Sequence, residues 1–169
     1  MMKSNCVKIL FSLIMLLSIN VTVAQNSATA TFTASVNIIE PITLTTTRNM
    51  HFADIDAQNG GQVILNTDDS RTATGGAILK KSGNATAANL QVKGQKGYSY
   101  SVQIPVQNVR ITNGSSEIIL KDFKTEIDSN TLNQDSQIIK VGATLDMQPG
   151  LDPGYYSTST PIAVVVSYN

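Results

Sequence analysis

The sequence predicts an all-β protein, built as an antiparallel β-sandwich. Three observations support this class. Short runs of alternating apolar and polar residues recur along the chain, and glycine, proline and asparagine separate them. Outside the first residues, no stretch has helical periodicity longer than about two turns. The composition is rich in Thr, Ser, Asn, Gln, Val and Ile and contains no Trp, which is typical of exposed β-sheet.

The first residues predict a secretory signal peptide. Lys3 and Lys8 form a basic start, an apolar run from Ile9 to Leu17 follows, and Thr22-Val23-Ala24 offers a small-residue cleavage site. The apolar run is short for a membrane span, although a membrane anchor stays open as the alternative. We expect cleavage after Ala24 and a secreted protein that resides in the periplasm, at the cell surface or outside the cell.

Cleavage would leave 169 − 24 = 145 residues, and we expect residues 25–169 to form a single domain. The only cysteine, Cys6, lies in the predicted signal peptide, so the mature chain would have no disulfide. The chain has 12 basic and 12 acidic residues, and without Lys3 and Lys8 the balance is 10 to 12. No basic patch suggests nucleic acid, and no polybasic segment suggests anionic lipid. We expect neither nucleic-acid binding nor membrane insertion.

The first strand of the mature chain is predicted at residues 28–38, where alternation is unbroken. One face of this segment is apolar, and the other carries Thr, Ser and Asn. The apolar face consists of Ala28, Ala30, Phe32, Ala34, Val36 and Ile38.

The chain also ends in a predicted strand, which starts near Tyr156 and runs to Tyr168. Its apolar face consists of Ile162, Val164, Val166 and Tyr168. A terminal strand this apolar needs a partner strand to hold it in place, and that partner can belong to another chain. Two such strands at opposite ends of the mature chain indicate assembly by strand pairing rather than catalysis.

Between these ends, further strands are expected wherever alternation is bounded by turn residues. They fall at residues 42–46, 50–52, 62–66, 77–80, 89–93, 98–104, 109–112, 117–127 and 138–144. Residues 67–70 are expected to form a loop, and Pro105 is expected to end the strand before it. The clearest hairpin joins 109–112 to 117–120 through Asn113-Gly114, a pair that suits a type I′ turn.

Several of these segments, in this order, resemble a family of secreted bacterial pilin-like domains, the domain of unknown function 4402. The matching segments are IEPITL at 39–44, MHFADI at 50–55, GQKGYSYSVQIP at 94–105, VGATL at 141–145 and GYYST at 154–158. Such domains look like relatives of chaperone–usher fimbrial subunits and spore-coat-U-type proteins. The resemblance implies a pilin-like, immunoglobulin-like β-sandwich in a fimbrial subunit that serves cell adhesion.

In fimbrial subunits of that kind, the fold lacks one strand. A periplasmic chaperone lends a strand first, and the N-terminal extension of the next subunit then replaces it. Carried onto this chain, the apolar face of 28–38 would fill a neighbour's groove, and the C-terminal strand would border the groove. The implied partners are a periplasmic chaperone and the protein itself or homologous subunits. The same alternation also fits a self-complete domain in which 28–38 folds back onto its own chain.

Candidates for chemistry are few, and we expect no enzyme, cofactor or metal site. His51 is the only histidine and stands between Met50 and Phe52, so a structural role is favoured. A zinc site is disfavoured, because the chain has one histidine and its one cysteine lies in the predicted signal peptide. The pairs Asp54/Asp56 and Asp68-Asp69 lack an EF-hand pattern and are interpreted as turn residues.

The tyrosines leave a binding function open. Tyr98, Tyr100, Tyr155 and Tyr156 could stack on sugar, as in a surface lectin, although Tyr98 and Tyr100 share one face and a core role is expected for at least one of them. An outer-membrane barrel is disfavoured by short strands and the absence of Trp. The sequence therefore favours a secreted assembly subunit, with a self-complete extracellular module that binds glycan or a surface protein as the alternative.

Overall fold

The structure is a computed structural model that describes residues 8, 11–13 and 27–169. The chain divides into two units, residues 1–37 and residues 38–169. Residues 8 and 11–13 are helical. The predicted signal peptide, residues 1–24, otherwise lies outside the described residues. Among the described residues, no helix has the length and apolarity that crossing a membrane requires.

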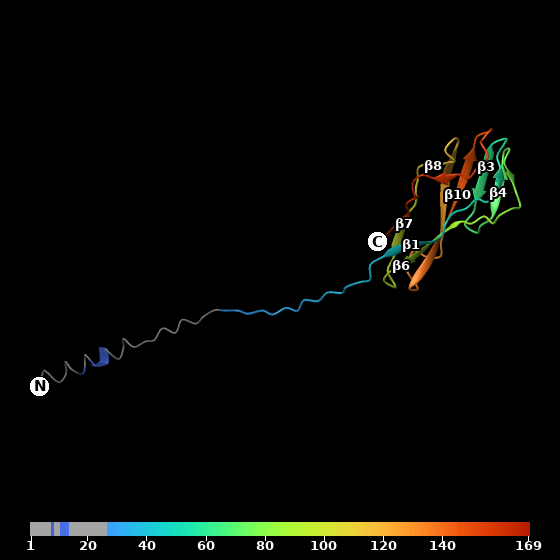
Figure 1. The fold of residues 1–169 in the computed structure, drawn as a ribbon. Helices are drawn as coiled ribbons and strands as arrows, with labels where there is room; N and C mark the ends of the chain where they lie inside the picture. Colours follow the sequence, from blue (N-terminus) through green and yellow to red (C-terminus); the bar gives the residue numbers. More distant parts are fainter. Residues whose placement is uncertain (1–7, 9–10, 14–26) are drawn as a thin grey trace. The chain divides into compact units, whose positions relative to one another are not determined.

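The unit formed by residues 38–169 is all-β, as the sequence predicts, and every strand pairing in it is antiparallel (Figure 1). The strands are β1 (Thr43–Arg48), β2 (Ile55–Asp56), β3 (Gly61–Leu65), β4 (Arg71–Thr74), β5 (Ile78–Leu79), β6 (Ala88–Lys93), β7 (Tyr100–Gln103), β8 (Val109–Thr112), β9 (Glu117–Ile127), β10 (Ser136–Met147), β11 (Ser157–Thr158) and β12 (Val165–Tyr168).

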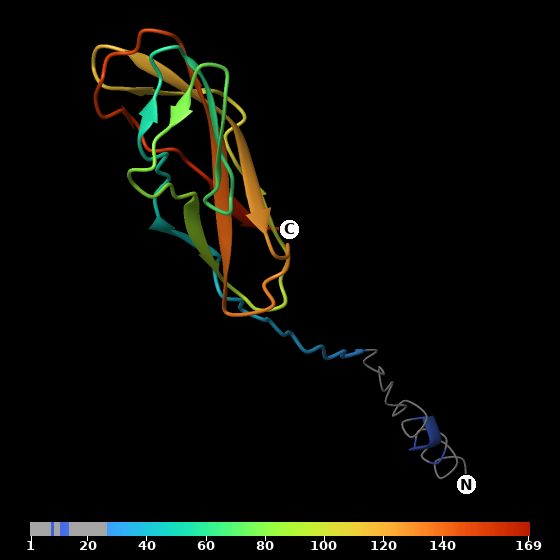
Figure 2. The same ribbon diagram turned by 90° about the vertical axis from the view of Figure 1, so that its right-hand side faces the viewer.

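The largest sheet is organised around β10, its longest strand. The strand order is β1-β6-β10-β9-β8-β11, and β3 and β4 form a branch beside β10. Along one edge, β10 pairs with β9; along the other, residues 136–141 pair with β6 and residues 143–147 pair with β3. Gly142 stands where the partner changes. In Figure 2 the orange strand β10 runs nearly the full length of the unit.

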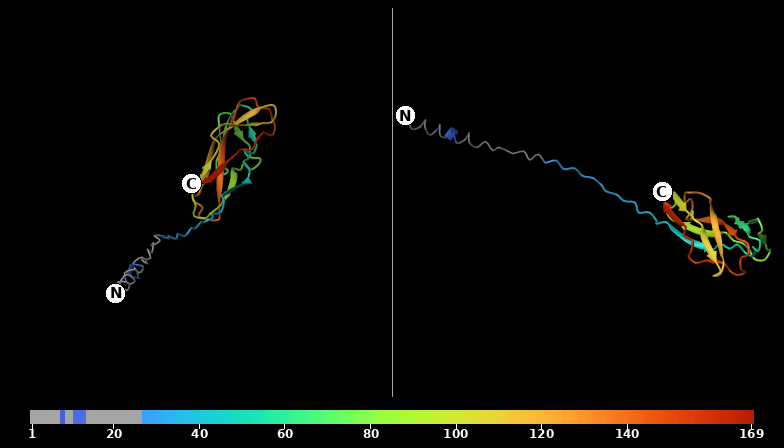
Figure 3. Two further views of the ribbon diagram at one scale, coloured as in Figure 1. Left: turned by 90° about the vertical axis from the view of Figure 1, so that its left-hand side faces the viewer. Right: turned by 90° about the horizontal axis from the view of Figure 1, so that it is seen from above.

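A second, two-stranded sheet pairs β12 with β7 in the register Tyr168↔Tyr100 to Val165↔Gln103. Its inward side chains pack against those of β6 and β10, so two layers enclose the core at this end. The strands β12 and β1 lie at the same end of the unit (Figure 3), and their Cα atoms approach within 8 Å. A third pair, β2 with β5, is short.

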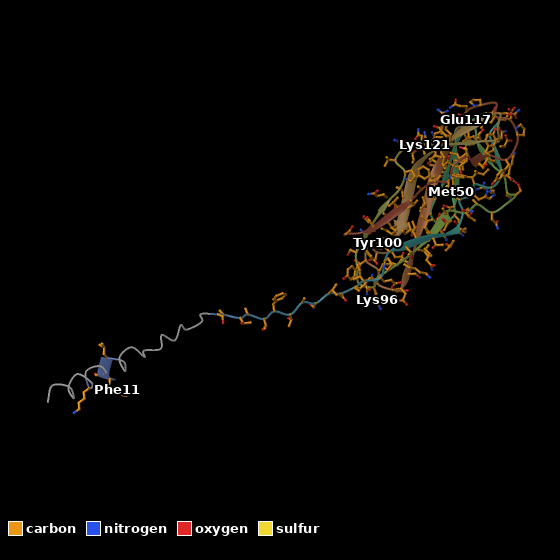
Figure 4. All side chains as sticks on the ribbon, turned by 60° about the vertical axis from the view of Figure 1, so that its left-hand side comes forward. Phe11, Met50, Lys96, Tyr100, Glu117 and Lys121 are labelled. Atoms are coloured by element: carbon orange, nitrogen blue, oxygen red, sulfur yellow. The ribbon has the colours of Figure 1, made fainter. Side chains whose placement is uncertain are left out.

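The core is divided into two clusters of buried residues. One consists of Val63, Ile118, Leu120, Ala143, Leu145 and Met147. The other consists of Leu90, Val92, Tyr100, Leu132, Ile139 and Val141. Only partly buried side chains join them, and among these Met50 and Phe123 pack against both clusters. Figure 4 shows Met50 between Tyr100, toward one end of the unit, and Glu117 at the other.

The predicted hairpin between β8 and β9 is confirmed, but its predicted type I′ turn is wrong. Thr112 pairs with Glu117, which leaves four residues in the loop rather than two. Gly114 has a positive φ of 96°, whereas Asn113 is absent from the residues with positive φ. Instead, the Asn113 side-chain oxygen accepts hydrogen bonds from the backbone N–H groups of Ser115 and Ser116, at 2.9 and 2.8 Å. The asparagine thus closes the loop through its side chain.

Two short strands, β2 and β4, were not expected from the sequence, and residues 50–52 form only a single bridge, between His51 and Thr86. No strand is assigned to residues 27–42. A strand requires hydrogen bonds to a partner, which alternation alone does not supply. The expectation that 28–38 pairs with another chain stays a prediction.

Candidate functional site

The unit contains an apolar groove of about 1230 Å³. It exceeds the roughly 300–1,000 Å³ of small-molecule pockets. Side chains from β6, β9 and β10 form its floor. Its two flanks are the segments 46–58 and 150–164, which are distant in sequence. The groove is therefore long and bounded by two lengths of chain, a shape suited to an extended peptide.

The floor of the groove belongs to the protein's own core. Six floor residues are buried members of the two core clusters: Leu90 and Val141 from one, and Ile118, Leu120, Leu145 and Met147 from the other. Met50 and Phe123, which touch both clusters, also line the groove. The groove therefore opens over the seam between the clusters, where an inserted apolar segment would join them into one core.

The strands at one end of the groove each have a free edge. In the part of the chain that the structure describes, β1 pairs only with β6, and β12 pairs only with β7. An edge strand presents unpaired N–H and C=O groups that can accept a further strand. The groove begins at Thr46, in β1, and at Val164, just before β12.

A cluster of hydrogen bonds forms around Tyr168, at the end of β12; we call it the Tyr168 latch. The Tyr168 hydroxyl donates to the Glu40 carbonyl at 2.8 Å and accepts from the Gln95 N–H at 2.6 Å. Glu40 N–H in turn donates to Gln95 Oε1 at 3.2 Å. The Tyr98 ring packs edge-on against the Tyr168 ring, with centroids 5.7 Å apart. The latch ties the segment before β1 to the end of β12.

Gly94 makes the latch sterically possible. A Cβ atom at this position would lie 2.2 Å from the Tyr168 hydroxyl oxygen and 3.2 Å from Leu132 Cδ1. A side chain larger than hydrogen would therefore displace the tyrosine from its two hydrogen bonds.

The four apolar residues predicted for the C-terminal strand contact the groove, the core or both. All four are half-buried and their neighbours in sequence are exposed, so the burial alternates as the sequence does. Ile162 and Val164 line the groove, and Val164 packs together with Val166 and Tyr168 on the core cluster of Leu90. In the segment 28–38, Phe32, Val36 and Ile38 are 92%, 85% and 87% exposed. Their apolar surface is available to a partner, and so is that of Ala28, Ala30 and Ala34, which are also exposed.

The residues considered for chemistry hold the fold together. His51 pairs its backbone N–H and C=O with Thr86, at 2.8 Å each, and its side chain is exposed. Asp68 accepts hydrogen bonds from both the N–H and hydroxyl of Ser70. Asp69 binds Arg48 and the Ala87 N–H, each at 2.7 Å. Among the described residues, no three metal-ligating side chains gather.

Charge at the groove is confined to its flanks. Asp54, Asp56 and Asp152 line the groove, while its floor carries no charged residue. Asp56 binds Lys80 at 3.0 Å and accepts a hydrogen bond from the Gln58 N–H. These hydrogen bonds, the one from Lys80 foremost, lower the pKa of Asp56. A charged segment would gain no partner over the floor, so the groove favours an uncharged, apolar occupant.

The tyrosines considered for sugar binding differ in how far they are buried. Tyr100 is 1% exposed, and its hydroxyl donates to Gln137 at 3.0 Å. Burial raises the Tyr100 pKa. Tyr156 packs against the cluster of Leu120, and its hydroxyl donates to the Asp152 carbonyl. Tyr155, 78% exposed, lines the flank of the groove. Of these three, Tyr155 alone presents its ring to solvent.

The fold and the groove define an all-β protein of antiparallel strands with an apolar surface groove. Its family follows from sequence: the model for "Domain of unknown function (DUF4402)" matches residues 42–168. The chain belongs to this family, as its sequence resemblance predicts. No curated protein and no solved structure matches the chain.

Sequence reasoning missed the floor of the groove and its seam residues, Met50 and Phe123. The apolar pattern of β9 and β10 is the same whether a strand faces a closed core or an open groove. The available signal was the apolar alternation at the two ends of the predicted mature chain.

Proposed function

We propose that the protein is a secreted structural subunit of a surface fibre, such as a fimbria, whose subunits are joined by β-strand donation. The groove floored by core residues supports this function most strongly. The six core residues that form the floor are themselves 3–7% exposed, and an apolar element laid in the groove would extend this core. A strand supplied by another chain would cover this core and could pair with the free edge of β1 or of β12.

The proposal includes an immunoglobulin-like arrangement of the layers, export through the predicted signal peptide, and a role in adhesion at the cell surface. An exported subunit with an open groove is prone to aggregate until the groove is filled. A periplasmic chaperone that lends a strand before assembly is therefore part of the proposal.

An SDS gel of cell-surface material, unheated beside boiled and probed with an antibody to residues 38–169, tests this function. Strand-joined subunits should form a ladder without heating, because a whole strand must leave the sheet before two subunits separate. Boiling should collapse the ladder to a monomer. A monomer band in both lanes would contradict strand donation.

A second candidate function is binding of glycan or a surface protein by a self-complete monomer. The exposed ring of Tyr155 beside Asp152, on the flank of the groove, favours it, because aromatic faces stack on sugars and carboxylates accept their hydroxyls. A glycan-array signal that disappears in Tyr155→Ala would support this candidate, with Tyr98→Ala as the control.

A further inference from the structure

We propose that Phe52 is a gate over the groove and that Arg71 holds this gate open. The gate turn, residues 52–54, belongs to the flank 46–58, and all three of its residues line the groove. The inference concerns access to the groove and is independent of which chain fills it. It goes beyond the proposed function, and an experiment on the monomer tests it separately.

The two ends of the gate turn are anchored, so that movement is confined to its middle. On one side, His51 exchanges two backbone hydrogen bonds of 2.8 Å with Thr86. On the other side, the Asp54 carbonyl accepts a hydrogen bond from the Lys80 N–H at 3.2 Å, and β2 then pairs with β5. A change of backbone conformation between these two anchors therefore moves Phe52.

The guanidinium group of Arg71, the first residue of β4, holds the gate turn by its backbone. Its Nη1 donates to the Phe52 carbonyl at 2.5 Å and to the Asp54 carbonyl at 3.3 Å, and its Nη2 donates to the Lys80 carbonyl at 3.1 Å. Because the guanidinium is planar, the carbonyls bound to it are fixed relative to one another. The strand β4 lies beside β3, which pairs with the floor strand β10 (Figure 1). Arg71 thus ties the gate turn to the floor.

The gate turn is held in a strained conformation. Between the two carbonyls that share Arg71 Nη1 lies Ala53, whose φ of 55° is left-handed. Alanine rarely adopts this region, because its Cβ crowds the backbone, and it persists there only where the surroundings impose it. Relaxation of Ala53 to a negative φ would turn the flanking carbonyls apart and break their shared contact. The strain at Ala53 and the hydrogen bonds of Arg71 therefore oppose each other.

The side chain of Phe52 gains by closing. It is half-buried and packs on the cluster of Leu120, and four members of that cluster form part of the floor. Movement onto the floor would remove more of its apolar surface from water, which is favourable. An empty groove therefore draws Phe52 inward as soon as the contacts of Arg71 are lost.

A gate of this kind gives an unfilled subunit a way to cover its floor. An exposed apolar surface favours association with other apolar surfaces, and the closed position of Phe52 reduces that surface. An occupant of the groove contacts the floor in place of Phe52 and keeps the gate open. Access to the groove is thus set by the balance between the burial of Phe52 and the hydrogen bonds of Arg71.

Binding of Nile red, an uncharged apolar dye, to the monomer fraction of the secreted chain tests the gate. We compare wild type with Arg71→Ala and with the double variant Arg71→Ala/Phe52→Ala, which has lost both the clamp and the gate. Arg110→Ala is the matched control, because Arg110 is an arginine at the surface that pairs with Glu117 at 3.0 Å and does not line the groove. Should Arg71→Ala fail to fold, Arg71→Lys replaces it, since lysine keeps the charge and lacks the planar fork.

We expect Arg71→Ala to bind the dye about tenfold more weakly than wild type, because apparent affinity falls with the fraction of molecules whose groove is open. The double variant should regain the wild-type affinity, and Arg110→Ala should keep it. Dye binding by Arg71→Ala that equals or exceeds that of wild type would overturn the inference, since a merely loosened fold exposes more apolar surface. The inference also fails if Phe52→Ala does not restore binding, or if wild type does not bind the dye. None of these outcomes bears on the ladder of unheated subunits, which tests the proposed function.

Discussion

Single residues tie together segments that are distant in the sequence. One hydroxyl group, that of Tyr168, joins three segments of chain, and Gly94 makes room for it. Asp69 has a left-handed φ of 69° and binds both Arg48 and the backbone N–H of Ala87, just before β6. Each of these contacts can be removed by one substitution that leaves the apolar core untouched.

The latch provides the first residue-level prediction. Tyr168→Phe removes the hydroxyl and should lower the free energy of unfolding by about 1–2 kcal/mol, since two hydrogen bonds are lost. Gly94→Ala should cost more, because the added Cβ also displaces the ring from Tyr98. Urea unfolding measures both. A Gly94→Ala variant as stable as wild type would show that the latch is unimportant.

The contacts of Asp69 provide the second residue-level prediction. Asp69→Ala leaves the Ala87 N–H and Arg48 without their acceptor and forces alanine into a left-handed φ, so we expect a loss of about 1–3 kcal/mol. Asp69→Asn keeps one acceptor oxygen and tolerates this φ, so its loss should be smaller. Thermal unfolding measures both variants. If Asp69→Ala and Asp69→Asn lose the same stability, the negative charge of Asp69 alone would account for its contribution.

At the scale of elements, β10 organises the sheet because it exchanges one partner strand for another along a single edge. The exchange at Gly142 brings the Leu65 carbonyl oxygen within 2.4 Å of where a Cβ would lie. Gly142→Ala should therefore force β3 away and destabilise the unit by about 1–3 kcal/mol. Lys140 on the same strand is half-buried and lies 3.9 Å from Glu126, and Lys140→Ala should change stability by less than about 1 kcal/mol. Chemical unfolding of both variants provides the comparison.

The pairing of β9 with β10 should also be sensitive to acid. Lys121 donates to Asp146 across the two strands, and this hydrogen bond lowers the Asp146 pKa and raises the Lys121 pKa. The Asp146 contribution is present above the ordinary aspartate pKa and disappears as pH falls through the lowered value. We expect Asp146→Asn to lower the Tm at pH 7 and to flatten its fall between pH 5 and 2. If the curves of Tm against pH for wild type and Asp146→Asn run parallel, this linkage is contradicted.

The sequence predicted long strands better than short ones. The alternation in β1, β6, β9 and β12 fixes which side chains face inward, and the structure has strands at or near the expected residues. The strand β4 escaped prediction because its four residues, Arg71–Thr74, become a strand only by pairing with β3. The Asn113 turn was misassigned because the Asn-Gly pair suits a two-residue turn, whereas the register leaves four residues in the loop. The groove escaped because the same apolar alternation fits a strand that faces a closed core and a strand that faces a groove.

At the scale of the whole molecule, the divided core implies that the described unit gains stability from an occupant. We expect Phe32→Ala to lower the temperature at which the unheated ladder collapses, since losing a buried phenylalanine costs about 3–5 kcal/mol in a closed core. Thr33→Ala, on the polar face of the same segment, is the matched control and should leave that temperature nearly unchanged. Equal collapse temperatures for wild type and Phe32→Ala would exclude Phe32 from the joint.

Because β12 pairs only with β7 in the part of the chain that the structure describes, its other edge is free to receive a strand from another chain. Pulling apart two subunits joined in this way would slide the added strand along β12, so that many backbone hydrogen bonds resist together instead of opening one after another. Such a joint resists force in shear even where each bond is weak. Mechanical strength would then come from strand direction, in a chain whose one cysteine, Cys6, lies in the predicted signal peptide.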